Sequence, residues 1–486
     1  MKEQSLTKNA ILNIIRQAMT IVFPLVTFPY VSRVLGKAEF GKYNFAVSIV
    51  SYFALLAAFG LTNYAVREGA RIRKDRKALS HLTSQLFSFN LLTSAVAYIL
   101  LFFITFYSSK LNIYFTLIAV QSLCIILTTL GLDWVNIVYE DFLYITVRYI
   151  IIQFIALIAI FLFVRKPDDT VIYCWIMIGG SYGGNVVNLF YIRKYVDVFF
   201  TFSIPFRKFF VPMAILFLNS LAVIIYVNSD ITILGMFESD SVVGVYSFSS
   251  KIYNILKQLV NAVIVVAVPR LVVTLVSDTQ RYRKYLEDIF NLLILILLPI
   301  SAGLFMLSKS IILIVGGQEY LVGESVLRLL SFSIIFALIS SIYTNCMLII
   351  GREEKKILIG TSISAIFNIV GNLILIPYIG MIGAALTTVL AEFLNMLVQR
   401  YCSKKYVLSN NLANWKTFIC SFLGAVIVVL GCWGINHIII GDTVIISALR
   451  IITAIVVSVP SYLLILIALK HKTIVAMLGK VKRAIG

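Results

Sequence analysis

Fourteen runs of predominantly apolar residues, each about twenty residues long, dominate this chain of 486 residues. A helix of about twenty residues crosses the hydrocarbon core of a bilayer, so each run predicts one transmembrane helix. The chain is 60% hydrophobic and only 13% charged, with a mean hydropathy of +0.97. A soluble protein could not cover that much apolar surface. The sequence therefore predicts an all-α polytopic membrane protein, with spans at 10–31, 43–65, 82–106, 113–137, 142–164, 170–192, 208–229, 242–268, 288–307, 325–350, 357–377, 380–400, 415–437 and 443–469.

A turn motif near the N-terminus returns near mid-chain. Residues 35–45 read LG and then GKYNF, and residues 234–248 read LG and then GVYSF after a longer turn. A duplicated helix pair indicates two homologous halves, a common plan among transporters. We therefore expect two pseudo-symmetric six-helix lobes around a central cavity, in residues 1–200 and 201–405. Residues 406–486 would add two further transmembrane helices and a basic tail.

The formal net charge of +19 is distributed unevenly among the loops. Alternate loops carry most of the lysines and arginines, including the run from Arg67 to Lys77 and the C-terminal residues from Lys470 to Arg483. The first turn departs from this alternation, with Arg33, Lys37 and Lys42. By the positive-inside rule both termini are cytoplasmic, which an even number of helices requires. The basic balance thus indicates membrane topology and no nucleic-acid partner.

Motifs of catalysis or metal binding are missing from the sequence. The three histidines, His81, His437 and His471, stand on separate segments with no acidic or cysteine partner at ligand spacing. The six cysteines show neither metal nor disulfide spacing. We therefore expect no catalytic residues, no metal and no cofactor, and a chain that is not an enzyme.

Polar residues form a stripe on the predicted helix 242–268. Ser247, Lys251, Asn254, Gln258 and Asn261 are spaced by four, three, four and three residues, which places them on one helix face. Such Ser and Asn residues also join neighbouring helices by hydrogen bonds, so a structural role is the alternative for them.

Charged residues inside predicted spans carry a stronger signal. Lys251 and Lys257 need water, a carboxylate or an anionic ligand, because a charge near the bilayer centre costs roughly 2.5–3.5 kcal/mol. The alternative for these lysines is a structural pairing with Asp133 or Glu392. Arg16 and Arg148 lie nearer the cytoplasmic ends of their helices, where long side chains reach the interface, so a topological role is open for both.

Several segments resemble the Wzx-type polysaccharide flippases of the multidrug/oligosaccharidyl-lipid/polysaccharide exporter superfamily. They are FPYVSRVLG followed by GKYNFA (28–46), GLTNYAVREGA (60–70), GLDW (131–134) with Glu140-Asp141-Phe142, LIIGREE (348–354) and NIVGNLILIPYIGMIGAALTTVLAE (368–392). The resemblance covers nearly the whole chain. It implies a multi-pass protein of the bacterial plasma (inner) membrane that flips an undecaprenyl-diphosphate-linked oligosaccharide outward. The product would be O antigen, capsule or exopolysaccharide.

The resemblance also implies a cationic cavity that meets the diphosphate. Arg33 matches a family motif, and the stripe adds the other candidate substrate-binding residues, Lys251, Lys257, Asn254 and Gln258, with Arg16 as a further cation. Asp133 and Glu392 are candidate carboxylates for coupling to a proton or sodium gradient. Membrane lipid and a polysaccharide polymerase are the other expected partners.

Two alternatives stay open at this point. A multidrug or cation antiporter of the same superfamily would place acidic groups in its cavity, whereas this chain places basic ones there. An integral-membrane polysaccharide polymerase would need a sizeable outer loop for its active site, and none of the predicted outer loops is that long.

Overall fold

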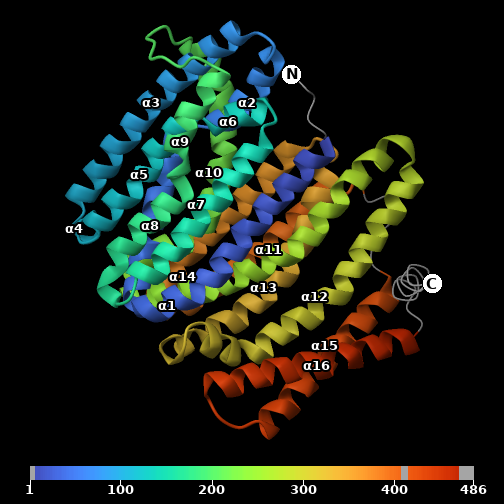
Figure 1. Cartoon of the computed structure of the whole chain (residues 1–486). Coiled ribbons are helices and arrows are strands. Elements are labelled where there is room, and N and C mark those ends of the chain that lie inside the picture. The colour runs from blue at the N-terminus through green and yellow to red at the C-terminus, as the bar shows by residue number, and fades with distance from the viewer. Residues whose placement is uncertain (1–5, 407–413, 470–486) are drawn as a thin grey trace. The chain divides into compact units, whose positions relative to one another are not determined.

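The computed structural model describes residues 6–406 and 414–469, and the regular elements within them are all helices (Figure 1). Nine helical stretches there are long and apolar enough to cross a membrane, and Phe115–Gly131 is a shorter apolar helix. The prediction of an all-α polytopic membrane protein is confirmed. The basic tail predicted after residue 469 lies outside the described residues.

The chain forms two compact units, Met1–Gly244 and Val245–Gly486. Unit 1 holds α1 (Leu6–Ala58), α2 (Leu61–Ile72), α3 (Arg76–Tyr107), α4 (Ser109–Asn112), α5 (Phe115–Gly131), α6 (Asp133–Val138), α7 (Phe142–Phe163), η1 (Pro167–Asp169), α8 (Thr170–Tyr182), α9 (Gly184–Tyr191), η2 (Ile192–Lys194) and α10 (Phe206–Phe237). Unit 2 begins within α11 (Asp240–Ser277) and continues with α12 (Thr279–Val315), η3 (Gln318–Gly323), α13 (Glu324–Ile342), the π-helical turn η4 (Tyr343–Leu348), α14 (Glu354–Cys402), α15 (Trp415–Ile438) and α16 (Val444–Ala468). The division into lobes at residues 200 and 405 stays a prediction.

Each of the fourteen predicted spans coincides with a helix or a pair of consecutive helices among the described residues. Two long helices, α1 and α14, each include two predicted spans. The backbone of each helix bends at a glycine near the boundary between those spans. Gly36 has φ 68° and Gly380 has φ 54°, a backbone conformation that residues with a side chain adopt only under strain. Gly36 is also where the sequence predicts the first turn.

The turn repeated in the sequence forms a contact within unit 1. A Cβ added to Gly41 would overlap the backbone carbonyl of Asp240, and one added to Gly244 would overlap the backbone carbonyl of Lys37. The equivalent glycines of the two copies therefore allow the start of α11 to lie directly against α1. Tyr114 Oη, at the start of α5, donates to Asp240 Oδ1 at 2.5 Å beside this contact.

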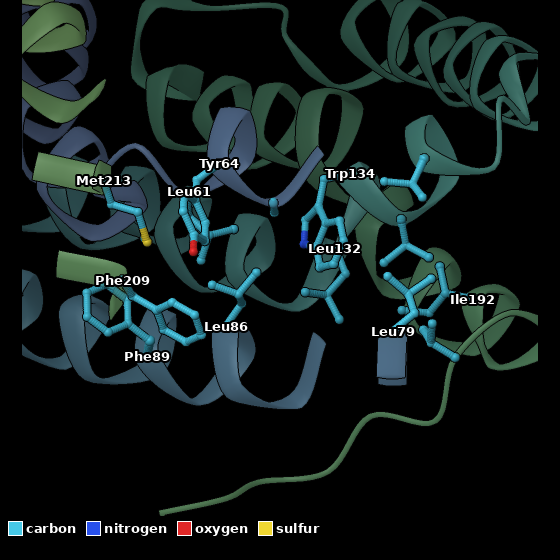
Figure 2. Packing of buried hydrophobic residues seen from close by; sticks show 14 residues of the cluster. Leu61, Tyr64, Leu79, Leu86, Phe89, Leu132, Trp134, Ile192, Phe209 and Met213 are labelled. Carbon is cyan, nitrogen blue, oxygen red and sulfur yellow. The ribbon is translucent and has the colours of Figure 1, made fainter. Parts of the chain in front are cut away.

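A buried apolar cluster ties α2 to the rest of unit 1 (Figure 2). Leu61 and Tyr64 of α2 pack with Phe89 of α3, Trp134 of α6 and Phe209 of α10. The opposite side of α2 carries exposed residues such as Arg67 and Arg71, so this helix is amphipathic. The basic run from Arg67 to Lys77 begins on this exposed side of α2, and we call this end of unit 1 the basic end.

In unit 2, α15 and α16 lie side by side and both pack on α12 (Figure 1). Leu307 of α12 is buried with Cys432 of α15 and Ala454 of α16. Lys309 Nζ lies 2.8 Å from Asp442 Oδ2 in the loop that joins the two helices. The two C-terminal helices are therefore a packed part of unit 2.

Candidate functional site

The polar stripe predicted on one helix lies on α11, and its charged neighbour Lys257 has a partner on α14. Lys257 Nζ lies 2.6 Å from Glu392 Oε1, and Tyr253 Oη donates to the same oxygen at 3.2 Å. Glu392 is only 3% exposed, whereas the Lys257 side chain is 32% exposed. A carboxylate buried among apolar helices needs a cationic partner, and Lys257 supplies it while keeping one side accessible.

Lys251 lies in a different environment on the same helix. Its side chain is exposed, and it makes no hydrogen bond or ion pair among residues 6–406 and 414–469. Six residues separate it from Lys257, so the two side chains point about 120° apart around the helix. The structure therefore does not bring the two lysines together: one is a paired cation and the other an accessible one.

The remaining stripe residues divide between exposed and structural positions. Gln258 is exposed, and Asn254 Nδ2 donates to Ser250 Oγ on its own helix at 3.3 Å. Asn261 Oδ1 accepts from Ser341 Oγ of α13, which in turn accepts from Asn345 Nδ2 at 2.8 Å. Asn261 thus joins helices, which is the structural role that the sequence leaves open for such residues.

Arg16 and Arg33 both lie on α1 in unit 1. Their separation along the helix is roughly 25 Å, so they do not belong to one cluster. Arg16 is half-buried and its Nη2 donates to Asn13 Oδ1 at 3.1 Å. Arg33 is exposed and stands between Pro29 and the bend at Gly36.

The second candidate coupling carboxylate, Asp133, is held in an ion pair inside unit 1. Arg148 Nη2 of α7 lies 2.7 and 2.8 Å from its two oxygens, and Asn188 Nδ2 of α9 donates to Oδ1 at 2.9 Å. The Arg148 side chain is only 10% exposed. Arg148 is thus a buried cation paired with a partly exposed carboxylate, and a purely topological role does not describe it.

Asp133 also lines a cavity of about 310 Å³ within unit 1. Asn90, Thr129, Tyr182 and Asn185 contribute polar groups to its wall. The chain reaches this position through a break between α5 and α6, where Leu132 has φ 47°. The break turns Asp133 out of the line of α5, whereas the sequence predicts one continuous span over 113–137.

The sequence does not predict the cluster of polar residues around Asp141 at the basic end. Asp141 accepts from Tyr191 Oη at 2.6 Å, Tyr195 Oη at 2.8 Å and Lys194 Nζ at 3.1 Å. The Lys194 ammonium also lies 3.6 Å from the centre of the Tyr191 ring. Burial opposes ionisation of Asp141, but these hydrogen bonds together hold its pKa below the usual value. The sequence motif Glu140-Asp141-Phe142 contains Asp141 but does not indicate which residues contact it.

Both units therefore contain an ion pair between membrane-embedded helices, and unit 2 adds an accessible lysine. These groups can bind an anion or exchange counter-ions. Within residues 6–406 and 414–469, no three His, Cys, Asp or Glu side chains are grouped as a metal site requires.

Comparisons with known proteins add family and fold. A family model described as "Polysaccharide biosynthesis protein" matches residues 6–275. The putative O-antigen transporter of Escherichia coli is 21% identical over 395 residues, which cover 80% of this chain and 94% of that protein. The probable low-salt glycan biosynthesis flippase of Haloferax volcanii is 25% identical over 185 residues, or 37% of this chain and 38% of that protein. An uncharacterized membrane protein of Methanocaldococcus jannaschii is 31% identical over 150 residues, which span 29% of each chain.

A solved structure shares the fold. The lipid II flippase MurJ, in an inward closed conformation, superposes with a TM-score of 0.70 at 16% sequence identity. The match covers 96% of this chain and 100% of that chain.

Proposed function

Because this chain belongs to the polysaccharide biosynthesis protein family, we propose that it is a flippase for undecaprenyl-diphosphate-linked oligosaccharide repeat units. It would move them from the cytoplasmic to the outer leaflet of the bacterial plasma membrane, for assembly of O antigen, capsule or exopolysaccharide. Both termini would be cytoplasmic. The family match carries the proposal, and the names of the E. coli and H. volcanii relatives support it.

The physical problem is the diphosphate. It cannot enter hydrocarbon unaided, whereas its polyprenyl tail can remain there throughout. A path lined by membrane-embedded cations lowers this barrier through charge-assisted contacts. We assign Lys251 as the first cation to meet the diphosphate, since it is exposed and has no partner in the described part of the chain. Arg33, which is exposed, is a further candidate on α1.

Lys257 would act next, by releasing the Glu392 carboxylate and binding the diphosphate in its place. Its ammonium neutralises Glu392 at 2.6 Å while a third of the side chain stays accessible. A diphosphate beside Lys257 competes with Glu392 for the same charge. The carboxylate would then take up a cation of its own, which makes Glu392 the better coupling candidate for a proton or sodium ion. Asp133, held by both Arg148 and Asn188, is the second.

The other substrate-binding candidates have smaller roles. Gln258 is exposed beside Lys257 and can donate to sugar hydroxyls, as Asn254 can. Arg16 would serve near the cytoplasmic entrance. A polysaccharide polymerase that uses the flipped product is the proposed partner.

Depletion in the native host tests this function. Without the protein, lipid-linked oligosaccharide should accumulate in the inner leaflet and the surface polymer should be lost. If the lipid-linked units reach the outer leaflet and stay unpolymerised, the chain is a polymerase. If neither changes while resistance to cationic drugs falls, it is a drug antiporter.

A further inference from the structure

An open groove of about 590 Å³ lies at the basic end of unit 1. It runs between the first turns of α3 and residues 195–205, a segment that we call the strap and that leads into α10. The groove is lined by Arg76, Lys77, Ser80, His81, Asp197 and Phe199. None of them takes part in the function proposed above.

The strap is fixed to α3 by a ladder of serines. The backbone N–H groups of Asp197, Phe199 and Thr201 donate to the Oγ atoms of Ser80, Ser84 and Ser88 at 3.0, 3.1 and 2.9 Å, respectively. Four residues of helix rise about 6 Å, and two residues of extended chain advance about 6.6 Å, so the two spacings agree. The wall of the groove is therefore built into the fold.

The groove lining has more basic side chains than acidic ones. Arg76 Nη2 donates to Asp197 Oδ1 at 3.2 Å and to the Arg193 carbonyl at 3.0 Å, so the one carboxylate in the lining is already compensated. Lys77 and His81 are exposed and make no hydrogen bond or ion pair within the described residues. An anion entering the groove would meet these two donors without displacing a partner.

The strap also presents exposed aromatic rings. Phe199, Phe200 and Phe202 are 52%, 50% and 91% exposed. Aromatic rings next to lysine and arginine at the ends of membrane helices are typical of the interfacial layer of a bilayer. The groove thus joins a cationic part to an apolar one.

We propose that this groove binds the headgroup of an anionic phospholipid from the leaflet that faces the basic end. The phosphodiester would lie between Lys77 and His81, and the first part of an acyl chain would lie over Phe199. A phospholipid fits better than a soluble phosphate because the lining includes Phe199 and the strap carries the exposed rings of Phe200 and Phe202, which an acyl chain can contact. Anionic headgroups of the cytoplasmic leaflet attract basic residues near the membrane surface.

Native mass spectrometry of the purified full chain tests the site by counting retained phosphatidylglycerol after titration. Lys77→Gln should lower retention about fivefold, as expected for one cation near an anionic headgroup. Lys74→Gln, which removes the same charge from an exposed lysine outside the groove, should leave retention unchanged. Phe199→Ala should also lower it, and phosphatidylcholine should not be retained.

Other results would overturn the proposal. Equal losses from Lys77→Gln and Lys74→Gln would indicate diffuse attraction to basic residues and no site. Displacement of the lipid by glycerol phosphate at similar concentration would indicate a soluble phosphate ligand. A melting curve of each variant establishes that it is folded before the lipid is counted.

Discussion

Lys257 and Glu392 form the ion pair that matters most at the scale of single residues. Lys257→Ala should lower the melting temperature, because it leaves the buried Glu392 carboxylate without its cationic partner. The double variant Lys257→Ala with Glu392→Ala removes both charges and should recover most of the melting temperature. Transport should nevertheless stay about tenfold or more below wild type, since the contact with the diphosphate is lost.

Lys251→Ala is the matched control on the same helix. Lys251 has no partner among the described residues, so its loss should leave the melting temperature unchanged and lower transport. If the double variant at Lys257 and Glu392 transports at the wild-type rate, the pair is structural and lies outside the substrate path.

Asp141 gives a residue-scale prediction about pH. Its pKa in the folded protein is lowered, despite burial, by Tyr191, Tyr195 and Lys194. A depressed pKa stabilises the fold above the unfolded value of about 3.9, and this stabilisation is lost as the pH falls through the lower folded value. Asp141→Asn should therefore melt several degrees below wild type at pH 7. This difference in melting temperature should become smaller below about pH 4. A gap that stays constant with pH would contradict the charged role of Asp141.

At the scale of elements, the contact between α1 and the start of α11 depends on glycine. Gly41→Ala would push a methyl group into the Asp240 carbonyl, and such overpacking typically costs 1–3 kcal/mol, marked by a lower melting temperature. Gly179→Ala in α8 is the control, because no side chain and no neighbouring element among the described residues lies within 4 Å of the added Cβ. It should be neutral or slightly stabilising, since alanine favours helix more than glycine does. Equal effects of the two substitutions would exclude the close contact.

The elements themselves could be predicted from sequence because apolar length is a local property. For that reason the sequence predicts the fourteen spans and the turn at Gly36. The pair Asp133–Arg148 was not predicted, and the pair Lys257–Glu392 was only one of several open alternatives, since each pair joins different helices and depends on how they pack. The break at Leu132 was also not predicted, because residues 113–137 together have the length and mean hydropathy of a single span.

At the scale of the whole molecule, the proposed topology rests on the alternation of charged loops in the sequence. Reporter fusions after Lys77 and Arg283 should report the cytoplasm, and fusions near Lys110, Asp169 and Glu238 should report the outside. Two or more inversions would contradict the fourteen-helix arrangement. The fusion site at Lys480 lies outside the described residues and is expected in the cytoplasm.

Transfer of a lipid-linked oligosaccharide between leaflets is the measurement that tests the flippase assignment most directly. Purified protein would be reconstituted in liposomes with an undecaprenyl-diphosphate-linked oligosaccharide, and a membrane-impermeant glycosidase would report the fraction in the outer leaflet. We predict that the protein speeds the exchange between leaflets and that Lys251→Glu with Lys257→Glu abolishes the increase. Exchange no faster than in protein-free liposomes would contradict the proposed function.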